Sequence, residues 1–166
     1  MEEITTLQTS APAIVLAQPK LRPAHRILVV EDDEFIRQLT AQSLGLCGYQ
    51  VTAAEDGLAG WRALNADTFD LMITDNNMPQ LTGIGLLKKL RAARMALPVI
   101  MATGILPQDE FDKFPWLQPA ATLLKPFTIS EYLETVRTVL HANAVEAGPI
   151  APPPDEQHPP QPAAYG

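Results

Sequence analysis

Residues 26–33 of the chain read Arg26-Ile27-Leu28-Val29-Val30-Glu31-Asp32-Asp33. A short apolar run that ends directly in acids is typical of a strand buried on both faces of a sheet. Such strands occur mainly in parallel sheets, because helices cover both faces of those sheets. Residues 26–30 are therefore predicted to form the first strand of an α/β domain.

Strand and helix patterns alternate from this strand to residue 145. Further strands are predicted at residues 49–53, 69–74, 98–102 and 121–124. Helices are predicted at residues 34–46, after a cap at Asp56, at 84–95, within 108–114, and after the capping box Thr128-x-x-Glu131. Pro115 and Pro119 should keep the fourth helix short or irregular. Five strands that alternate with helices predict a parallel sheet covered on both faces.

Helical spacing also predicts which side chains pack on the core. The expected inward-facing residues of the first two helices are Phe35, Ile36, Leu39 and Leu46, then Leu58, Trp61 and Leu64. Cys47 follows the first helix and is expected to pack as a small apolar residue. Trp116 is expected to plug the core, with a partner surface as the alternative.

The globular part of the chain is predicted to span residues 25–145. Residues 146–166 are rich in proline and lack Lys and Arg, a composition that sustains neither a helix nor a sheet ladder. Residues 1–24 show no sustained period and are also predicted to be disordered, although Ile14-Val15-Leu16 could dock on the domain. A chain of 166 residues has room for one domain, and no attached output domain is predicted.

The overall composition argues against several function classes. The net charge of -7 disfavours a nucleic-acid-binding protein, which usually carries a clustered basic face. No apolar stretch approaches the roughly 18 residues that span a membrane, and the acidic N-terminus is unlike a signal peptide. The single cysteine allows no disulfide within the chain. These features predict a cytoplasmic protein that binds neither nucleic acid nor a membrane.

Polar residues follow four of the predicted strands, at the edge where open parallel sheets bind ligands. The first strand ends in Glu31-Asp32-Asp33, the third in Asp75, the fourth in Thr103 and the fifth in Lys125. Clustered carboxylates repel one another unless a cation joins them, and hard oxygen ligands suit Mg²⁺. A lysine and a hydroxyl across from them would complete a site for a tetrahedral anion. Taken singly, each residue has a structural explanation, such as a helix cap at Asp32, so only the combination indicates a site.

These residues resemble the motifs of CheY-like response regulator receiver domains. The matching motifs are Asp32-Asp33, Asp75-x-x-Met78-Pro79 with Gly83, Ala102-Thr103-Gly104 and Lys125-Pro126-Phe127. The resemblance covers about residues 26–145. It implies a flavodoxin-like (βα)5 sandwich, a doubly wound α/β fold whose parallel five-stranded sheet has the strand order 2-1-3-4-5. It also implies a two-component signalling module that catalyses only its own phosphorylation and dephosphorylation.

The resemblance assigns the nucleophile and the metal ligands. Asp75 is the expected nucleophile, which takes a phosphoryl group from a phosphohistidine and forms an acyl phosphate. Asp33, Asp75 and the backbone carbonyl of Asn77 are the expected Mg²⁺ ligands, with Asp32 acting through a water. The phosphoryl donor is expected to be a sensor histidine kinase or a histidine phosphotransfer protein.

The resemblance also assigns the residues that would bind and report the phosphoryl group. Lys125 is expected to pair with one phosphoryl oxygen, and the Thr103 hydroxyl is expected to move towards another. The peptide bond between Lys125 and Pro126 is expected to be cis. The signal would then pass to a downstream protein target, which the sequence does not identify.

Three features depart from the family pattern. Thr122 stands three residues before Lys125, where many members carry a Tyr or Phe that swings inward on activation. Ile105 is bulky and apolar and would screen the acyl phosphate from water. The proline-interrupted segment 107–119 lies in the face that members often use for signalling. These departures concern the readout of the signal rather than the phosphorylation site.

Two other function classes remain open. A flavodoxin-like cofactor carrier would need a loop rich in Ser, Thr and Gly after the first strand, where this chain has the acids 31–33. An aspartyl-phosphate phosphohydrolase would carry an Asp-x-Asp motif there, but Phe35 stands two residues after Asp33. Both alternatives fit the strand-end residues less well than a receiver domain does.

Overall fold

The computed structural model describes residues 24–146 and shows one sheet of five parallel strands. The strands are β1 (Arg26–Val30), β2 (Gln50–Ala54), β3 (Leu71–Thr74), β4 (Val99–Thr103) and β5 (Ala121–Leu124). Their order, β2-β1-β3-β4-β5, confirms the predicted flavodoxin-like arrangement. Apart from Ala24 and Glu146, the extensions predicted to be disordered lie outside the described residues.

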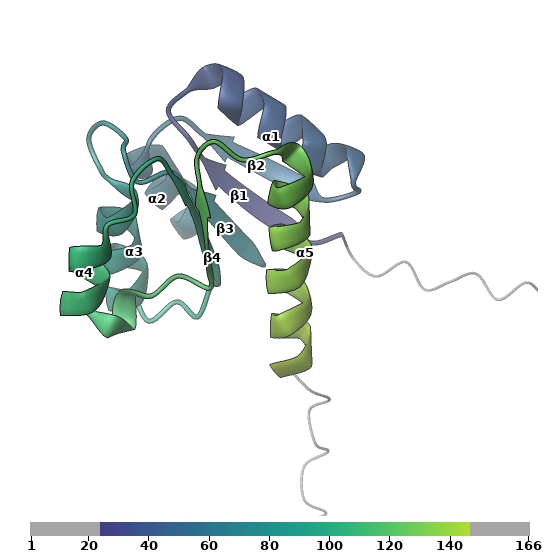
Figure 1. Cartoon of the computed structure of the whole chain (residues 1–166). Coiled ribbons are helices and arrows are strands. Elements are labelled where there is room, and N and C mark those ends of the chain that lie inside the picture. The colour runs from purple at the N-terminus through teal and green to yellow at the C-terminus, as the bar shows by residue number, and fades with distance from the viewer. Residues whose placement is uncertain (1–23, 147–166) are drawn as a thin grey trace, which may run out of the picture.

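Helices cover both faces of this sheet (Figure 1). α1 (Glu34–Leu46) and α5 (Ile129–Glu146) pack on one face, and α2 (Gly57–Ala66), α3 (Gly83–Ala92) and α4 (Gln108–Lys113) lie on the other. Within β1, Leu28 and Val30 join the core on the α2–α3 side, whereas Ile27 and Val29 join the core on the α1–α5 side. Both faces of β1 are therefore buried, which explains its uninterrupted apolar run.

The fourth helix is short, as predicted. α4 has six residues and is followed by a single 3₁₀ turn, Pro115–Leu117. It is joined to α3 by an ion pair in which Lys88 Nζ lies 2.7 Å from Glu110 Oε2. Phe111 and Leu117 fill the core positions of this segment, whereas Trp116 is 56% exposed. The prediction that Trp116 plugs the core is therefore wrong.

The predicted inward face of α1 is also wrong, except at Ile36, which is half-buried. The side chains that instead face solvent, with their exposed fractions, are Phe35 (73%), Leu39 (40%) and Leu46 (91%). Thr40 and Leu44 are the buried residues of this helix. The Thr40 hydroxyl donates to the Ile36 carbonyl oxygen at 2.7 Å. Because this bond satisfies the hydroxyl within the helix, a polar residue can lie on the inner face, where the apolar pattern does not reveal it.

One predicted contact of α2 and the predicted packing of Cys47 also differ from the structure. Trp61 and Leu64 pack on the core as predicted, but Leu58 is exposed. Gly60 takes the inner position, because a Cβ there would lie only 2.9 Å from a methyl carbon of Val30. Cys47 follows the last residue of α1 as its C-cap and is exposed, so its predicted packing role is wrong.

α5 begins at the predicted capping box. The backbone N–H of Thr128 donates to Glu131 Oε2 at 2.7 Å, and the N–H of Glu131 donates to Thr128 Oγ1 at 3.2 Å. Leu133, Val136 and Leu140 face the core from this helix, as its period predicts. Within residues 24–146, neither α5 nor any other helix combines the length and apolar character needed to span a membrane.

Candidate functional site

Three carboxylates meet where β1 and β3 end. The two strands are paired in register, and the Asp75 N–H extends the ladder by donating to the Val30 carbonyl oxygen at 3.0 Å. Glu31 and Asp32 follow Val30 directly at the same level. Carboxylate oxygens of Glu31, Asp32 and Asp75 consequently lie within 4.8 Å of one another. Glu31 and Asp75 are buried, whereas Asp32 is exposed.

Lys125 brings a positive charge to this cluster from the end of β5. Its backbone N–H donates to the Thr103 carbonyl oxygen at 2.9 Å, which continues the β4–β5 pairing beyond the strands. Its Nζ atom lies 2.6 Å from Asp75 Oδ2 and 2.8 Å from Glu31 Oε2. The peptide bond between Lys125 and Pro126 is cis, as the resemblance implied. The ends of β1, β3 and β5 thus contribute to one site, although β4 lies between β3 and β5.

Burial governs the protonation of this cluster. Desolvation raises the pKa of Glu31 above its ordinary value, although the hydrogen bond and the charge of Lys125 oppose the rise. Desolvation pushes the pKa of Lys125 down, but its hydrogen bonds to Asp75 and Glu31 more than offset this and the pKa is raised. One ammonium group faces three acids, an arrangement whose charge favours a further cation. Carboxylate oxygens of this kind fit Mg²⁺.

The loop after Asp75 holds its carboxylate in place. Asp75 Oδ1 accepts the backbone N–H groups of Asn76 and Asn77, the latter at 3.1 Å. The Asn76 side chain accepts the Ile84 N–H at 3.1 Å at the start of α3. A Cβ at Gly83 would collide with the Asp75 carbonyl oxygen, so glycine allows this close approach of helix and loop. The Asp75 carboxylate is therefore held in a defined position by its own loop.

The structure brings together Asp32, Asp75 and Lys125 of the predicted site but not Asp33. Asp33 is the N-cap of α1, and its Oδ1 atom accepts the Ile36 N–H at 2.9 Å. The cluster is therefore shifted by one residue from the assignment that the resemblance implied. Glu31 and Asp32 stand beside Asp75, where Asp32 and Asp33 were expected. The signal for this shift was present in the sequence, because a helix predicted to begin at residue 34 makes Asp33 its N-cap.

Asn77 and Thr103 lie near the cluster without joining it through side-chain hydrogen bonds in the described part of the chain. Asn77 is exposed and contributes its backbone N–H to Asp75. Thr103 is buried at the end of β4, and its hydroxyl donates to the Ile105 carbonyl oxygen at 3.1 Å. The Thr103 hydroxyl is thus engaged by its own loop rather than by Asp75.

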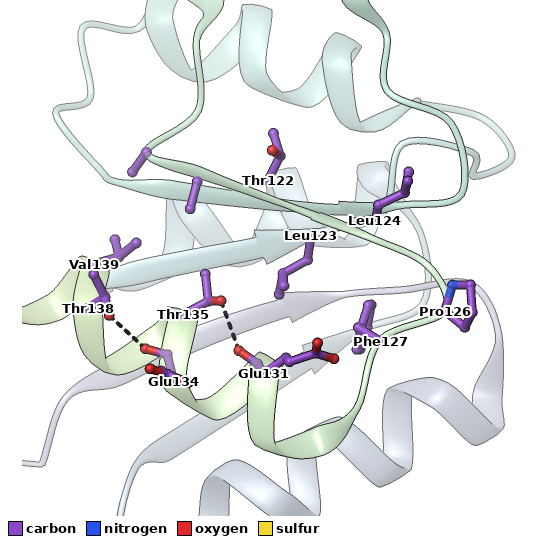
Figure 2. Close-up of a pocket in the computed structure, with 12 residues that line it drawn as sticks. Thr122, Leu123, Leu124, Pro126, Phe127, Glu131, Glu134, Thr135, Thr138 and Val139 are labelled. Carbon is purple, nitrogen blue, oxygen red and sulfur yellow. Dashed lines mark hydrogen bonds between the residues drawn. The ribbon is translucent and has the colours of Figure 1, made fainter.

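An exposed groove runs along β5 and α5, and Thr122 of β5 is among the residues that border it (Figure 2). The groove has a volume of about 510 Å³. Figure 2 shows Leu123 on the side of β5 that faces α5 and Thr122 on the opposite side. Thr122 is exposed on this edge strand.

Comparison with known proteins identifies the class that this fold and site define. The sequence model of the response regulator receiver domain matches residues 27–137. The chain therefore belongs to the response regulator receiver domain family, whose members are signalling modules of two-component systems. The acids 31–33, in place of a loop for a flavin phosphate, are in accord with this membership.

Individual relatives support the same conclusion. The chain is 33% identical over 124 residues to the alkaline phosphatase synthesis transcriptional regulatory protein PhoP of Bacillus subtilis, covering 74% of this chain and 51% of PhoP. It is 31% identical over 140 residues to the sensor protein EvgS of Escherichia coli, covering 84% of this chain and 11% of EvgS. A CheY-like receiver domain structure from Methanospirillum hungatei superposes with a TM-score of 0.69 at 28% identity, covering 74% of this chain and 98% of that one. The chain spans about half the length of curated regulators such as PhoP.

Proposed function

We propose that Asp75 accepts a phosphoryl group from the phosphohistidine of a histidine kinase or a histidine phosphotransfer protein. The observation that carries this proposal is the contact of Lys125 Nζ with Asp75 Oδ2 inside a cluster of three carboxylates. An Asp75 carboxylate oxygen would attack phosphorus, the P–N bond would break, and its electron pair would return to the imidazole of the donor. The product on this chain would be an acyl phosphate.

The metal ligands proposed here follow the geometry of the cluster. Asp32 and Asp75 would hold Mg²⁺, with Glu31 beside them, and Asn77 could add its backbone carbonyl. Asp33 is left out because its carboxylate caps α1. Bound Mg²⁺ would neutralise the negative charge of the phosphoryl oxygens. The exposure of Asp32 leaves this side of the cluster open to the metal.

Lys125 and Thr103 would bind the oxygens of the transferred group. Lys125 already lies against Asp75 and needs only to exchange a carboxylate oxygen for a phosphoryl oxygen. The Thr103 hydroxyl is held by one acceptor in its own loop, the Ile105 carbonyl, and can exchange that partner by rotating. Incubation of the purified chain with acetyl phosphate and Mg²⁺, followed by intact-mass analysis, tests the proposal.

The phosphoryl donor would dock on an apolar groove beside the acceptor site. The groove has a volume of about 470 Å³ and is lined by Ile36, Leu39, Thr40, Lys125, Pro126, Phe127 and Ile129. Lys125 belongs to both the groove and the acceptor site, so a protein seated here would carry its histidine next to Asp75. The exposed Phe35 on the first turn of α1 extends the apolar surface. We assign the groove to the histidine-bearing domain of the donor.

Alanine at Phe35 or Leu39 should therefore weaken transfer from a donor protein without changing the reaction with acetyl phosphate. Loss of a central apolar contact in an interface lowers affinity by about tenfold or more. Initial rates of transfer from phosphorylated histidine kinases of the source genome would measure the effect at limiting receiver concentration. Leu46→Ala is the control, because Leu46 is also an exposed apolar residue of α1 and lies at the far end of the helix. Equal losses with acetyl phosphate would instead place these side chains in the chemical step.

Phosphorylation should order residues 104–118 and leave the surroundings of Thr122 nearly unchanged. Thr122 lacks the volume to fill the space that a moving Thr103 would leave, so the change has to pass through the loop after Thr103. That loop carries the exposed Ile105 and leads into the short α4, features of a segment with low local stability. Hydrogen exchange with and without beryllofluoride measures this. Protection gained near Thr122 and α5, with none in residues 104–118, would contradict it.

A further inference from the structure

Tyr132 presents a buried polar group that the proposed phosphorylation site does not yet use. It lies on the inner face of α5, is 1% exposed, and stacks on Phe127 with ring centroids 5.5 Å apart. Within the described residues, its hydroxyl is the single buried side-chain polar atom without a hydrogen-bond partner. An unpaired buried hydroxyl costs free energy, because the group gives up its bonds to water. A phenylalanine would fill the same space without this cost.

A small, partly open cavity is lined both by this residue and by members of the acidic cluster. Its volume is about 10 Å³, close to the size of one water molecule. Its polar walls belong to Glu31, Thr40, Thr74, Asp75 and Tyr132. An internal water is stable only where two to four polar groups can bind it, and these walls meet that condition. The cavity can therefore join α5 to the floor of the acceptor site.

Glu31 is the carboxylate of the cluster that would gain most from a hydrogen bond to such a water. Its carboxylate is buried, and among the described residues Lys125 is its only hydrogen-bond donor. When Lys125 pairs with a phosphoryl oxygen, Glu31 loses donors in a place that water reaches poorly. A buried carboxylate without donors is unfavourable. Burial raises the pKa of Tyr132, so its hydroxyl keeps its proton and can serve as a donor.

We propose that Tyr132 is a positioning residue of the phosphoacceptor site, whose hydroxyl holds Glu31 in place through one internal water in this cavity. The hydroxyl donates to the water, and the water donates to the Glu31 carboxylate. The contact holds Glu31 while Lys125 turns to the incoming phosphoryl group. This inference rests on the proposed phosphorylation of Asp75, and it gives α5 a direct part in that reaction.

Thr40 offers the competing explanation. The Thr40 hydroxyl lies close to the Tyr132 hydroxyl and offsets part of the rise that burial causes in the pKa of Tyr132. No hydrogen bond of normal geometry joins the two hydroxyls. The Thr40 hydroxyl already donates to the Ile36 carbonyl oxygen at 2.7 Å, so it could only accept from Tyr132. A direct bond to Thr40 would tie α5 to α1 and would leave Glu31 unaffected. The two explanations differ in what happens to phosphorylation.

The test compares the full chain with its Tyr132→Phe variant in saturation kinetics with acetyl phosphate and Mg²⁺, followed by intact mass. We expect the maximal rate to fall about three- to tenfold, while the half-saturating concentration of acetyl phosphate stays unchanged. Tyr49→Phe is the control, because Tyr49 is a half-buried tyrosine that packs against the same core cluster at the opposite end of the sheet. The control should react at the parent rate.

The outcomes separate this inference from the function on which it rests. An unchanged maximal rate for Tyr132→Phe overturns the inference. In that case a higher melting temperature would indicate that the hydroxyl is unpaired in the parent chain, and a lower one would indicate a direct bond to Thr40. A change in the half-saturating concentration alone overturns it as well, because a positioning role acts on the reacting complex. If the parent chain takes up no phosphoryl group, the proposed function fails first and the inference with it.

Discussion

The Asp75→Asn variant should gain no phosphoryl group under conditions in which the parent chain gains one. An amide is not a nucleophile towards phosphorus, and Asp75 is the carboxylate that both Lys125 and the backbone of its own loop hold in place. Asparagine has nearly the same shape and still accepts hydrogen bonds, so the loop should keep its conformation. Intact mass after incubation with acetyl phosphate and Mg²⁺ measures the difference.

Asp70→Asn provides the matched control for this substitution. Asp70 directly precedes β3, whereas Asp75 directly follows it, so the two positions lie at opposite ends of one strand. The control should be phosphorylated at the parent rate. Modification that persists in Asp75→Asn would mean that another carboxylate of the cluster, with Asp32 the most accessible, is the true acceptor.

Asp32→Asn should remove most of the stabilisation of the protein by Mg²⁺, whereas Asp33→Asn should preserve it. A ligand that binds only the folded state adds about 1.4 kcal/mol to the free energy of unfolding at tenfold excess over its Kd. Asp32 shares the cluster with Glu31 and Asp75, and loss of its charge should remove most of this gain. Asp33 caps α1, and asparagine caps a helix about as well as aspartate, so that variant should keep both its stability and its metal response.

Thermal melts of the parent chain and both variants, over a series of Mg²⁺ concentrations, make this comparison. The pair is well matched, because the two substitutions remove the same charge from neighbouring exposed residues. A shift that survives in Asp32→Asn and disappears in Asp33→Asn would restore the ligand assignment expected from the family motif. A parent chain without any shift would count against Mg²⁺ at this site.

Local sequence patterns were sufficient for the succession of strands and helices in this protein, whereas the order of the strands in the sheet was expected from the family resemblance. The continuous apolar run of β1 predicts a strand buried on both faces, because neither its hydrogen bonds nor its side chains need water. Helix starts were readable where a side chain bonds to its own first turn, as at Asp56 and at Thr128 with Glu131. The short α4 followed from Pro115, which cannot continue a helix. Each of these signals acts over a few residues and needs no knowledge of the rest of the chain.

The strand ends were predictable as a group but not residue by residue. Asp75 and Lys125 could be placed at one edge, because parallel strands all end on the same side of a sheet. The backbone between β1 and α1 determines whether Glu31 or Asp33 turns towards Asp75. A shift of one residue there moves an acid from the carboxylate cluster to the N-cap of α1. The sequence pattern of three consecutive acids is the same in both cases.

Only the tertiary structure decided which faces pack and which polar groups meet. The inner face of α1 contains Thr40, whose hydroxyl is satisfied by its own helix, and its apolar residues such as Phe35 lie outside. Tyr132 looks like an ordinary core residue of α5 until the fold places it on a cavity that Glu31 also lines. The sequence by itself determined where strands and helices form, because those choices are local. Which residues form the site depends on contacts between residues up to 94 positions apart, and no local pattern encodes such contacts.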